Sequence, residues 1–221
     1  MSSVNSQPSS LLLNTFFWKQ KQKVFKKGQI ILHIDNYNGD VFYLESGFIK
    51  IYGLGINGDE RIYAFHKPPL IFPISYIFNS TKKEIFYEAI NIATVRVAKN
   101  EEFMHFIKNN THALLETTLE VVELLNNYMA RIDNLEFGKS YPRLIFRLLV
   151  LAKRFGIAKG GEVTIELPIT HKDLANTLSI TRETTSREVE VLIKKKLLKW
   201  QNRLFVIPNI KKLEKELEEN Y

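Results

Sequence analysis

The chain has 221 residues and a net charge of +7, with 31 Lys+Arg against 24 Asp+Glu. It contains no Cys, which excludes disulfides, Cys-ligated zinc, Cys-ligated iron–sulfur clusters and a Cys nucleophile. The length fits one large domain or two small ones.

The positive charge is concentrated in the last third of the chain. Residues 1–138 carry 14 Lys+Arg and 14 Asp+Glu, whereas residues 139–221 carry 17 and 10. Residues 139–208 carry 14 Lys+Arg and 6 Asp+Glu, so their net charge is +8 when the segment after Pro208 is left out. A neutral part joined to a basic part indicates an attached module that binds a polyanion. A solvated Lys-rich surface is the alternative that charge alone leaves open.

Residues 1–20 are predicted to be a flexible N-terminus. The first ten residues are rich in Ser, Asn and Gln and lack the apolar stretch of a signal peptide. The apolar run 70–78 is broken by Pro73 and is too short to cross a bilayer, which needs about 20 apolar residues. We therefore expect a soluble, cytoplasmic protein without a membrane partner.

Residues 21–98 are predicted to form a domain of short strands. Apolar segments are separated by turn sequences at 38–40, 46–47 and 57–59, each of which contains Gly. The last strand is expected at 89–98. Short strands with turns at regular spacing are typical of a sandwich or barrel.

Residues 99–138 are predicted to be helical, with one long helix over 111–136 that contains neither Gly nor Pro. An apolar stripe follows it in alternating steps of four and three, the spacing of a coiled coil. This stripe is the predicted dimer interface and comprises Leu114, Thr118, Val121, Leu125, Tyr128, Ile132 and Leu135. A second stripe comprises Leu115, Leu119, Val122 and Met129. We expect one stripe to pack on the chain's own strands and the other on a second copy. A central helix in a monomer is the alternative.

Residues 139–221 are predicted to contain two short helices joined by a tight turn, a helix-turn-helix. Thr170 and Asp173 resemble a capping box at the start of the first helix, and Thr181 is placed to cap the second. The predicted inner faces comprise Leu174, Ala175 and Leu178 in the first helix and Thr185, Val189 and Leu192 in the second.

The second helix, 182–194, has a polar outer face in its first two turns. We predict that Arg182, Glu183, Ser186 and Arg187 read bases in a major groove, since Arg pairs with guanine and Glu accepts from cytosine. Segment 197–207 is typical of a β-hairpin wing. The predicted contacts to the DNA backbone are Thr170, Thr181, Thr184 and Arg203. A plain helical pair with solvated charges is the alternative.

These segments resemble a known family. The string Thr170-x-x-Asp173-Leu174-Ala175 and the string Ile180-Thr181-Arg182-Glu183-Thr184-x-Ser186-Arg187 resemble the helix-turn-helix of the cyclic-AMP receptor protein and fumarate–nitrate reductase regulator (Crp/Fnr) family. The glycine-punctuated strands resemble its effector domain, through Phe25-x-x-Gly28-x-x-Ile31, the stretch 41–52 and Gly58-x-Glu60. The resemblance covers about residues 20–208. Ser179 stands where many members have Gly.

The resemblance implies an α+β fold with an N-terminal β-roll (a double-stranded β-helix, cyclic-nucleotide-binding-like), a long dimerisation helix and a C-terminal winged helix-turn-helix. It implies a homodimeric transcription regulator that binds double-stranded DNA at a palindromic operator. RNA polymerase would be a further partner of an activator. An enzyme built on the β-roll is not expected, because His33 and His66 stand isolated in the sequence.

No cofactor or metal is predicted. Family members that bind cyclic nucleotides carry a Gly-Glu … Arg-Ser/Thr cassette, and here no Gly lies between Gly58 and Gly138 and no Arg between Arg61 and Arg96. Haem ligation is not expected from the scattered His33, His66, His105 and His112. The aromatic segment 65–87 is expected to fill the roll, with an apolar pocket as the alternative. The alternative function is a ligand- or haem-sensing β-roll protein whose C-terminal domain contacts protein.

Overall fold

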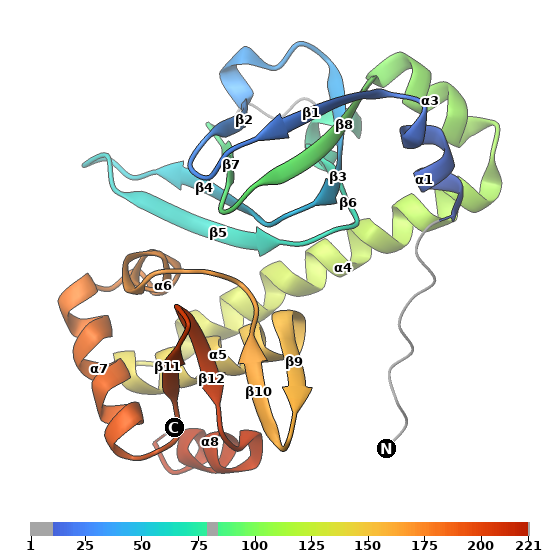
Figure 1. Ribbon diagram of the computed structural model, residues 1–221. Helices are drawn as coiled ribbons and strands as arrows, with labels where there is room; N and C mark the ends of the chain where they lie inside the picture. The colour runs from blue at the N-terminus through green and yellow to red at the C-terminus, as the bar shows by residue number, and fades with distance from the viewer. Residues whose placement is uncertain (1–10, 79–83, 221) are drawn as a thin grey trace. The chain divides into compact units, whose positions relative to one another are not determined.

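The computed structural model describes residues 11–78 and 84–220 (Figure 1). The chain divides into two compact units. The first comprises the described residues of 1–50 and 66–125, and the second comprises 51–65 and the described residues of 126–221.

The first sheet is antiparallel, with the strand order β1 (Lys21–Phe25), β8 (Ala93–Lys99), β3 (Asp40–Ser46) and β6 (Leu70–Phe72). Strand β3 lies inside it, and Phe42 is the register partner of Val97 on one side and of Phe72 on the other. Four consecutive residues of β3, 41–44, are buried. A continuous apolar run rather than an alternating one is what a strand covered on both faces requires.

The second sheet has the strand order β2 (Ile30–His33), β7 (Phe86–Ala89), β4 (Ile49–Leu54) and β5 (Glu60–His66). A short 3-10 helix, η1 (Ile34–Asn36), follows β2, and helix α2 (Ile74–Phe78) follows β6. Gly58, in the turn between β4 and β5, has φ +78°, a conformation that favours glycine. The Asn-Gly turn signal therefore predicted this hairpin correctly.

Helix α1 (Leu11–Trp18) belongs to the core of the first unit. Leu13 and Phe17 are fully buried, and the Phe17 ring stacks on Tyr43 of β3 with 4.8 Å between centroids. Phe103 of α3 (Asn100–Lys108) packs in the same cluster. Residues 11–18 were predicted to be part of a flexible N-terminus, and in this stretch the prediction is wrong because both apolar side chains find a core. Residues 1–10 lie outside the described part of the chain.

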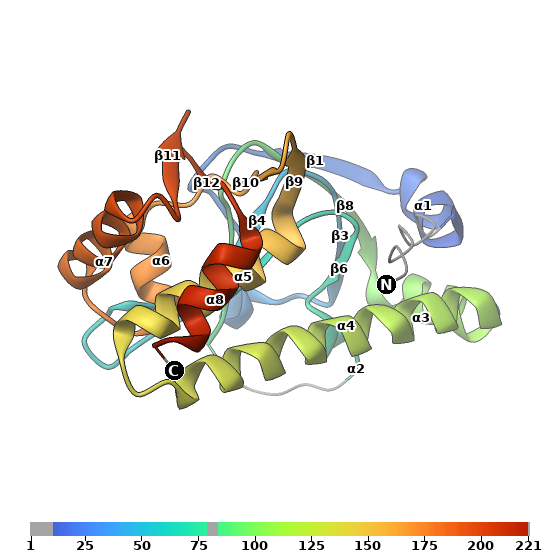
Figure 2. The same cartoon turned by 90° about the horizontal axis from the view of Figure 1, so that it is seen from below.

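Helix α4 (Thr111–Glu136) runs without interruption, as Figure 2 shows. Its bounds are those predicted from the sequence, because a stretch of 26 residues without Gly or Pro offers no early stop.

The part of the second unit that follows α4 contains four helices and a small sheet. The helices are α5 (Ser140–Phe155), α6 (His171–Leu178), α7 (Arg182–Lys194) and α8 (Ile210–Glu218). The sheet has the order β11 (Lys199–Gln201), β12 (Leu204–Ile207), β10 (Glu162–Ile165) and β9 (Gly156–Lys159). Helix α8 packs along α5 (Figure 2), where the Tyr141 hydroxyl donates to Glu216 at 2.9 Å.

Three elements differ from the sequence prediction. The expected strand 89–98 is two strands, because Ala89 ends β7 and β8 begins at Ala93. No strand was predicted at 156–159, yet β9 begins at Gly156 and returns through the Gly160-Gly161 turn to pair with β10. No element was predicted after Pro208, but Asn209 caps α8 and Leu213 is fully buried.

The predicted α+β class is confirmed, with a β-sheet domain first, a long helix next and a helix-turn-helix domain last. Within the described residues, no helix combines the length and the apolar character that a membrane span needs.

Candidate DNA-binding surface

Helices α6 and α7 begin at side-chain caps. The Thr170 hydroxyl accepts from the Asp173 amide at 3.1 Å, and the Asp173 carboxylate accepts from the Thr170 amide at 2.8 Å. This confirms the predicted capping box, with Asp in place of Glu. At α7 the Thr181 hydroxyl accepts from the Thr184 amide at 3.1 Å, so Thr181 is the predicted N-cap.

The turn between the two helices depends on a left-handed residue. Ser179 has φ +56° and ψ +41°, and its amide donates to the Ala175 carbonyl. Proteins of the family that this motif resembles often have Gly here, and this backbone conformation explains that preference. Ser179 holds the same conformation, although a side chain makes it less favourable.

The inner faces of both helices are buried as predicted. Leu174, Ala175 and Leu178 of α6 are at most 2% exposed, and Thr185, Val189 and Leu192 of α7 at most 1%. From outside the motif, Arg143 of α5 donates to the Leu178 carbonyl at 3.2 Å. The helix pair is therefore held at a fixed angle by its own core and by α5.

The outer face of α7 presents charge at its start. Arg182, Glu183 and Arg187 are exposed and lie in the first two turns. The first amides of α7 and the positive end of its dipole lie at the same place, where a phosphate oxygen is favourably bound. Of the predicted backbone contacts, Thr170 and Thr181 are exposed and Thr184 is half-buried, and all three hydroxyls already take part in capping.

Ser186 differs from its neighbours, because its hydroxyl lies 3.0 Å from Nδ1 of His171. The His171 ring also stacks on Phe205 and meets Trp200 edge-on. Burial and the nearby Arg182 lower the pKa of His171, so the imidazole is neutral at pH 7. Sequence reasoning missed His171, since a single His at a helix start has no distinctive spacing. Ser186 therefore links α7 to the start of α6 and, through the His171 ring, to the wing.

The predicted wing is the β11–β12 hairpin, which pairs Gln201 with Leu204. Its two turn residues, Asn202 and Arg203, have φ +50° and +63°. Two positive φ values are the mark of a type I′ turn, which matches the twist of a two-residue hairpin. Arg203 is exposed at this tip, so its charge is available to a polyanion.

Helix α4 leaves its predicted dimer stripe uncovered. Leu114, Val121, Leu125, Tyr128 and Ile132 are 38–61% exposed, Thr118 is exposed, and the side chain of Leu135 lies outside the described residues. The second stripe is exposed as well, at 48–56%. The expectation that one stripe packs on the chain's own strands is therefore wrong.

A third face of α4, which carries small and polar side chains, covers the first unit instead. Ala113 and Thr117 are buried there, and the Glu120 carboxylate accepts from the Ile71 amide at 3.2 Å. Two apolar stripes thus remain available on the same helix.

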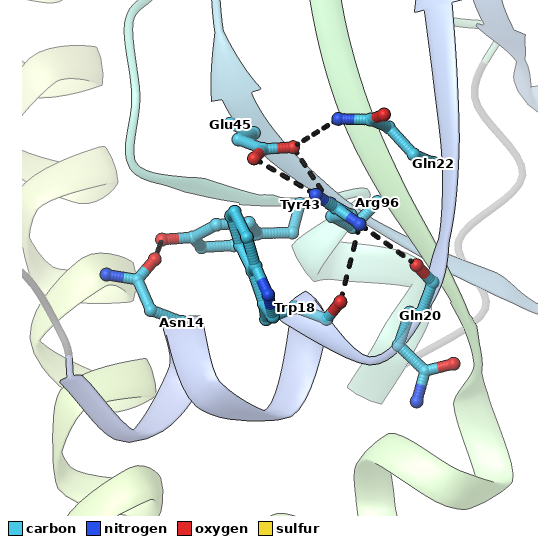
Figure 3. Close-up of polar contacts among 7 residues, drawn as sticks. All are labelled: Asn14, Trp18, Gln20, Gln22, Tyr43, Glu45 and Arg96. Carbon is cyan, nitrogen blue, oxygen red and sulfur yellow. Dashed lines mark hydrogen bonds and ion pairs between the residues drawn. The ribbon is translucent and has the colours of Figure 1, made fainter.

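Arg96, the next arginine after Arg61 in the sequence, is engaged by neighbouring groups of the first unit. Arg96 forms a two-pronged contact with Glu45, at 2.8 and 3.2 Å, and also donates to the carbonyls of Trp18 and Gln20 (Figure 3). The guanidinium lies 4.7 Å from the Trp18 ring. This network fixes the end of α1, and Gln20 just before β1, to strands β3 and β8.

In the described part of the aromatic segment 65–87, rings pack into the core of the first unit. Phe72 stacks on Phe42 at 5.3 Å and on Tyr87 at 5.0 Å, and all three are buried. Nearby, Lys50 and Glu88 form an ion pair at 3.3 Å. The four histidines considered for haem are spread over β2, β5, α3 and α4, at His33, His66, His105 and His112.

Comparison with known proteins finds two families. Residues 22–110 match the cyclic nucleotide-binding domain, and residues 142–216 match the Crp-like helix-turn-helix domain. A global nitrogen regulator of Nostoc sp. is 24% identical over 160 residues, 72% of each chain. The nitrogen fixation regulation protein FixK of Rhizobium meliloti is 27% identical over 178 residues, 79% of this chain and 76% of that one.

Solved structures show the same fold. A mutant of CooA from Carboxydothermus hydrogenoformans superposes with a TM-score of 0.79 at 20% identity, over 96% of this chain and 97% of that one. FixK2 from Bradyrhizobium japonicum gives 0.73 at 22% identity, over 89% and 96%.

Proposed function

Because the chain belongs to the Crp/Fnr family of transcription regulators, we propose that it binds a palindromic DNA operator as a homodimer. Each subunit would insert α7 into a major groove, and the two helices would enter successive grooves about 34 Å apart. The observation that carries the proposal is the exposed face of Arg182, Glu183 and Arg187 at the capped start of α7.

The dimer is supported by the unburied stripe on α4. A helix of 26 residues that exposes five large apolar side chains at coiled-coil spacing loses free energy in water. In a symmetric dimer, the α4 helix of the second copy would cover that stripe. The two-fold axis that relates the two α4 helices would also relate the two α7 helices.

We further propose that the protein regulates transcription without catalysing a reaction and without binding a cyclic nucleotide. The relatives are regulators by name. The chain lacks the Gly and Arg residues that hold a cyclic phosphate, and Arg96, the next arginine along, is engaged by Glu45. Calorimetric titration with cyclic AMP and cyclic GMP should therefore show no binding at micromolar concentration, and micromolar binding would contradict this part. If the protein activates transcription, it would also contact RNA polymerase.

Selection of bound DNA from a random pool tests the main proposal, with purified protein alone and with cell extract added. We expect an enriched sequence with two-fold symmetry, and binding that keeps its preference over random DNA as salt rises. Failure to enrich any sequence in either condition would contradict it and would favour the alternative in which the C-terminal domain contacts protein.

A further inference from the structure

Three potential metal ligands come together at one end of the second sheet, far from α7 in the sequence. Nε2 of His33 lies 3.6 Å from a carboxylate oxygen of Asp35 and 3.6 Å from one of Glu84. All three donor atoms lie within 4.8 Å of one another. His33 looked isolated in the sequence because Glu84 stands 51 positions later, and only the strand pairing places it here.

The backbone explains why these residues meet. His33 is the last residue of β2 and is the register partner of Phe86, and the Ile34 amide donates to the Ile85 carbonyl at 3.0 Å. The turn of η1 then brings Asp35 back beside His33. Glu84 lies just before β7, next to the end of the same ladder.

The imidazole of His33 has a fixed orientation. Its ring stacks on Phe86 with 4.1 Å between centroids and 9° between planes. The Nε2 atom is shielded from solvent and has no hydrogen-bond partner within the part of the chain that the structure describes. A buried polar nitrogen without a hydrogen bond is costly, and such groups in native proteins usually have a ligand or a role.

From this geometry we propose that His33, Asp35 and Glu84 bind one divalent transition-metal ion. Ligands at about 2.1 Å from a tetrahedral ion are spaced about 3.4 Å apart, and the two 3.6 Å separations are close to that spacing. A gap of 3.6 Å is too long for a hydrogen bond between Nε2 and a carboxylate. Small rotations of the two exposed carboxylates would close the site.

The donor set selects the class of ion. One imidazole and two carboxylates give a mixed nitrogen and oxygen site that suits Zn²⁺, Mn²⁺, Fe²⁺, Co²⁺ or Ni²⁺, and their two negative charges balance the charge of the ion. Three protein ligands leave at least one position for water, and the Asp35 and Glu84 side chains are 66% and 52% exposed. The site would therefore exchange its ion with solvent, unlike a closed structural zinc site.

Binding of Zn²⁺ and Co²⁺ to the full-length protein tests the proposal, with any affinity tag removed because tags bind these ions. We expect calorimetry to show one Zn²⁺ per chain, and Co²⁺ to gain visible absorption when added to the protein. His33→Gln, and separately the double variant Asp35→Asn with Glu84→Gln, should weaken binding by more than about 100-fold. The double variant changes only exposed groups, so it tests the site even if His33→Gln disturbs the strand.

His105→Gln is the matched control. His105 is an exposed histidine on α3, four positions after Glu101, so it offers the same chemistry without three converging ligands. This variant should bind Zn²⁺ as the wild type does. The proposal is overturned if the wild type binds no Zn²⁺ at micromolar concentration, since the three groups are then a simple ion-pair cluster. It is also overturned if the double variant binds as tightly as the wild type.

Discussion

At the scale of single residues, the charged side chains of the second unit divide into those that would read bases and those that would hold the DNA backbone. Arg187→Ala should cost about 1–3 kcal/mol at one cognate base pair and relax the preference there. Arg203→Ala should weaken binding to operator and random DNA alike and reduce the salt slope by about one. Both side chains are exposed, so stability should change little.

Quantitative gel shifts on the selected operator, on single-base variants of it and on random DNA measure both effects. Equal binding of wild type and Arg187→Ala to every operator variant would exclude Arg187 from base reading. A change of sequence preference in Arg203→Ala would move Arg203 from the backbone contacts to the base-reading ones.

Glu120 gives α4 a pH-dependent stability. Burial, with a smaller part from the nearby Glu123 and Glu116, raises its pKa to about 7, although the hydrogen bond from the Ile71 amide acts in the opposite direction. The folded state holds the proton of the Glu120 carboxyl more tightly than the unfolded state does. The contribution of this group to the free energy of unfolding is therefore fully present below about pH 4.5 and is lost as the pH rises through 7.

Glu120→Gln keeps an acceptor for the Ile71 amide without the charge. At pH 8.5 the variant should therefore be more stable than wild type, by up to about 3 kcal/mol, and the difference should shrink towards pH 5. Urea unfolding at both pH values measures it. Asp133→Asn removes the same charge from an exposed position of the helix, 13 residues after Glu120, and should have little effect. An equal gain at both pH values would show that burial of the charge is not the cause.

At the scale of elements, the turn between α6 and α7 is held in a conformation that its residue does not favour. Ser179→Gly should remove the left-handed penalty and raise the free energy of unfolding by about 0.5–1 kcal/mol, after the greater freedom of Gly in the unfolded chain is counted. Lys172→Gly, at an exposed position inside α6, should instead lower it by about 0.5–1 kcal/mol. Thermal unfolding compares the two, and a loss of stability in Ser179→Gly would contradict the expectation.

Elements were predictable where local chemistry defines their ends. Thr170 with Asp173 and Thr181 mark the starts of α6 and α7, and the helix bounds followed. Strand β9 was missed because it is only four residues long and mostly exposed, so no apolar pattern marks it, and helix α8 was missed because its stability comes from a partner distant in sequence. The partners of β9 lie across a glycine turn, and Leu213 of α8 is buried where that helix packs on α5.

Helix α4 shows that the sequence pattern does not reveal which face of a helix is buried. The spacing of its apolar residues showed two stripes, but only the fold shows that Ala113, Thr117 and Glu120 cover the first unit. Likewise, no local pattern could bring Glu84 to His33, since that contact depends on the pairing of β2 with β7. Patterns of residues close together in the sequence therefore predicted the candidate DNA-binding surface, but they did not predict the residue cluster that forms only when β2 pairs with β7.

At the scale of the whole molecule, the proposed function requires two copies. One helix-turn-helix reads only a half-site, and linking two of them makes the second binding event intramolecular, which strengthens binding by about 10²–10⁴-fold. The coiled-coil stripe of α4 is the surface proposed for that link, and Leu125, 58% exposed, lies near its middle.

Leu125→Glu should therefore give a monomer, because it places a charge in the centre of an apolar helix–helix contact. Sedimentation should show a dimer for wild type and a monomer for this variant, and operator affinity should fall by about 10²–10⁴-fold while contact with a single half-site persists. Glu123→Lys changes the charge at an exposed position outside both stripes and should remain dimeric. If Leu125→Glu is still a dimer, the copies associate through another surface. If wild type binds its operator tightly as a monomer, the link between α4 and DNA binding is wrong, although the roles of the α7 residues would stand on their own tests.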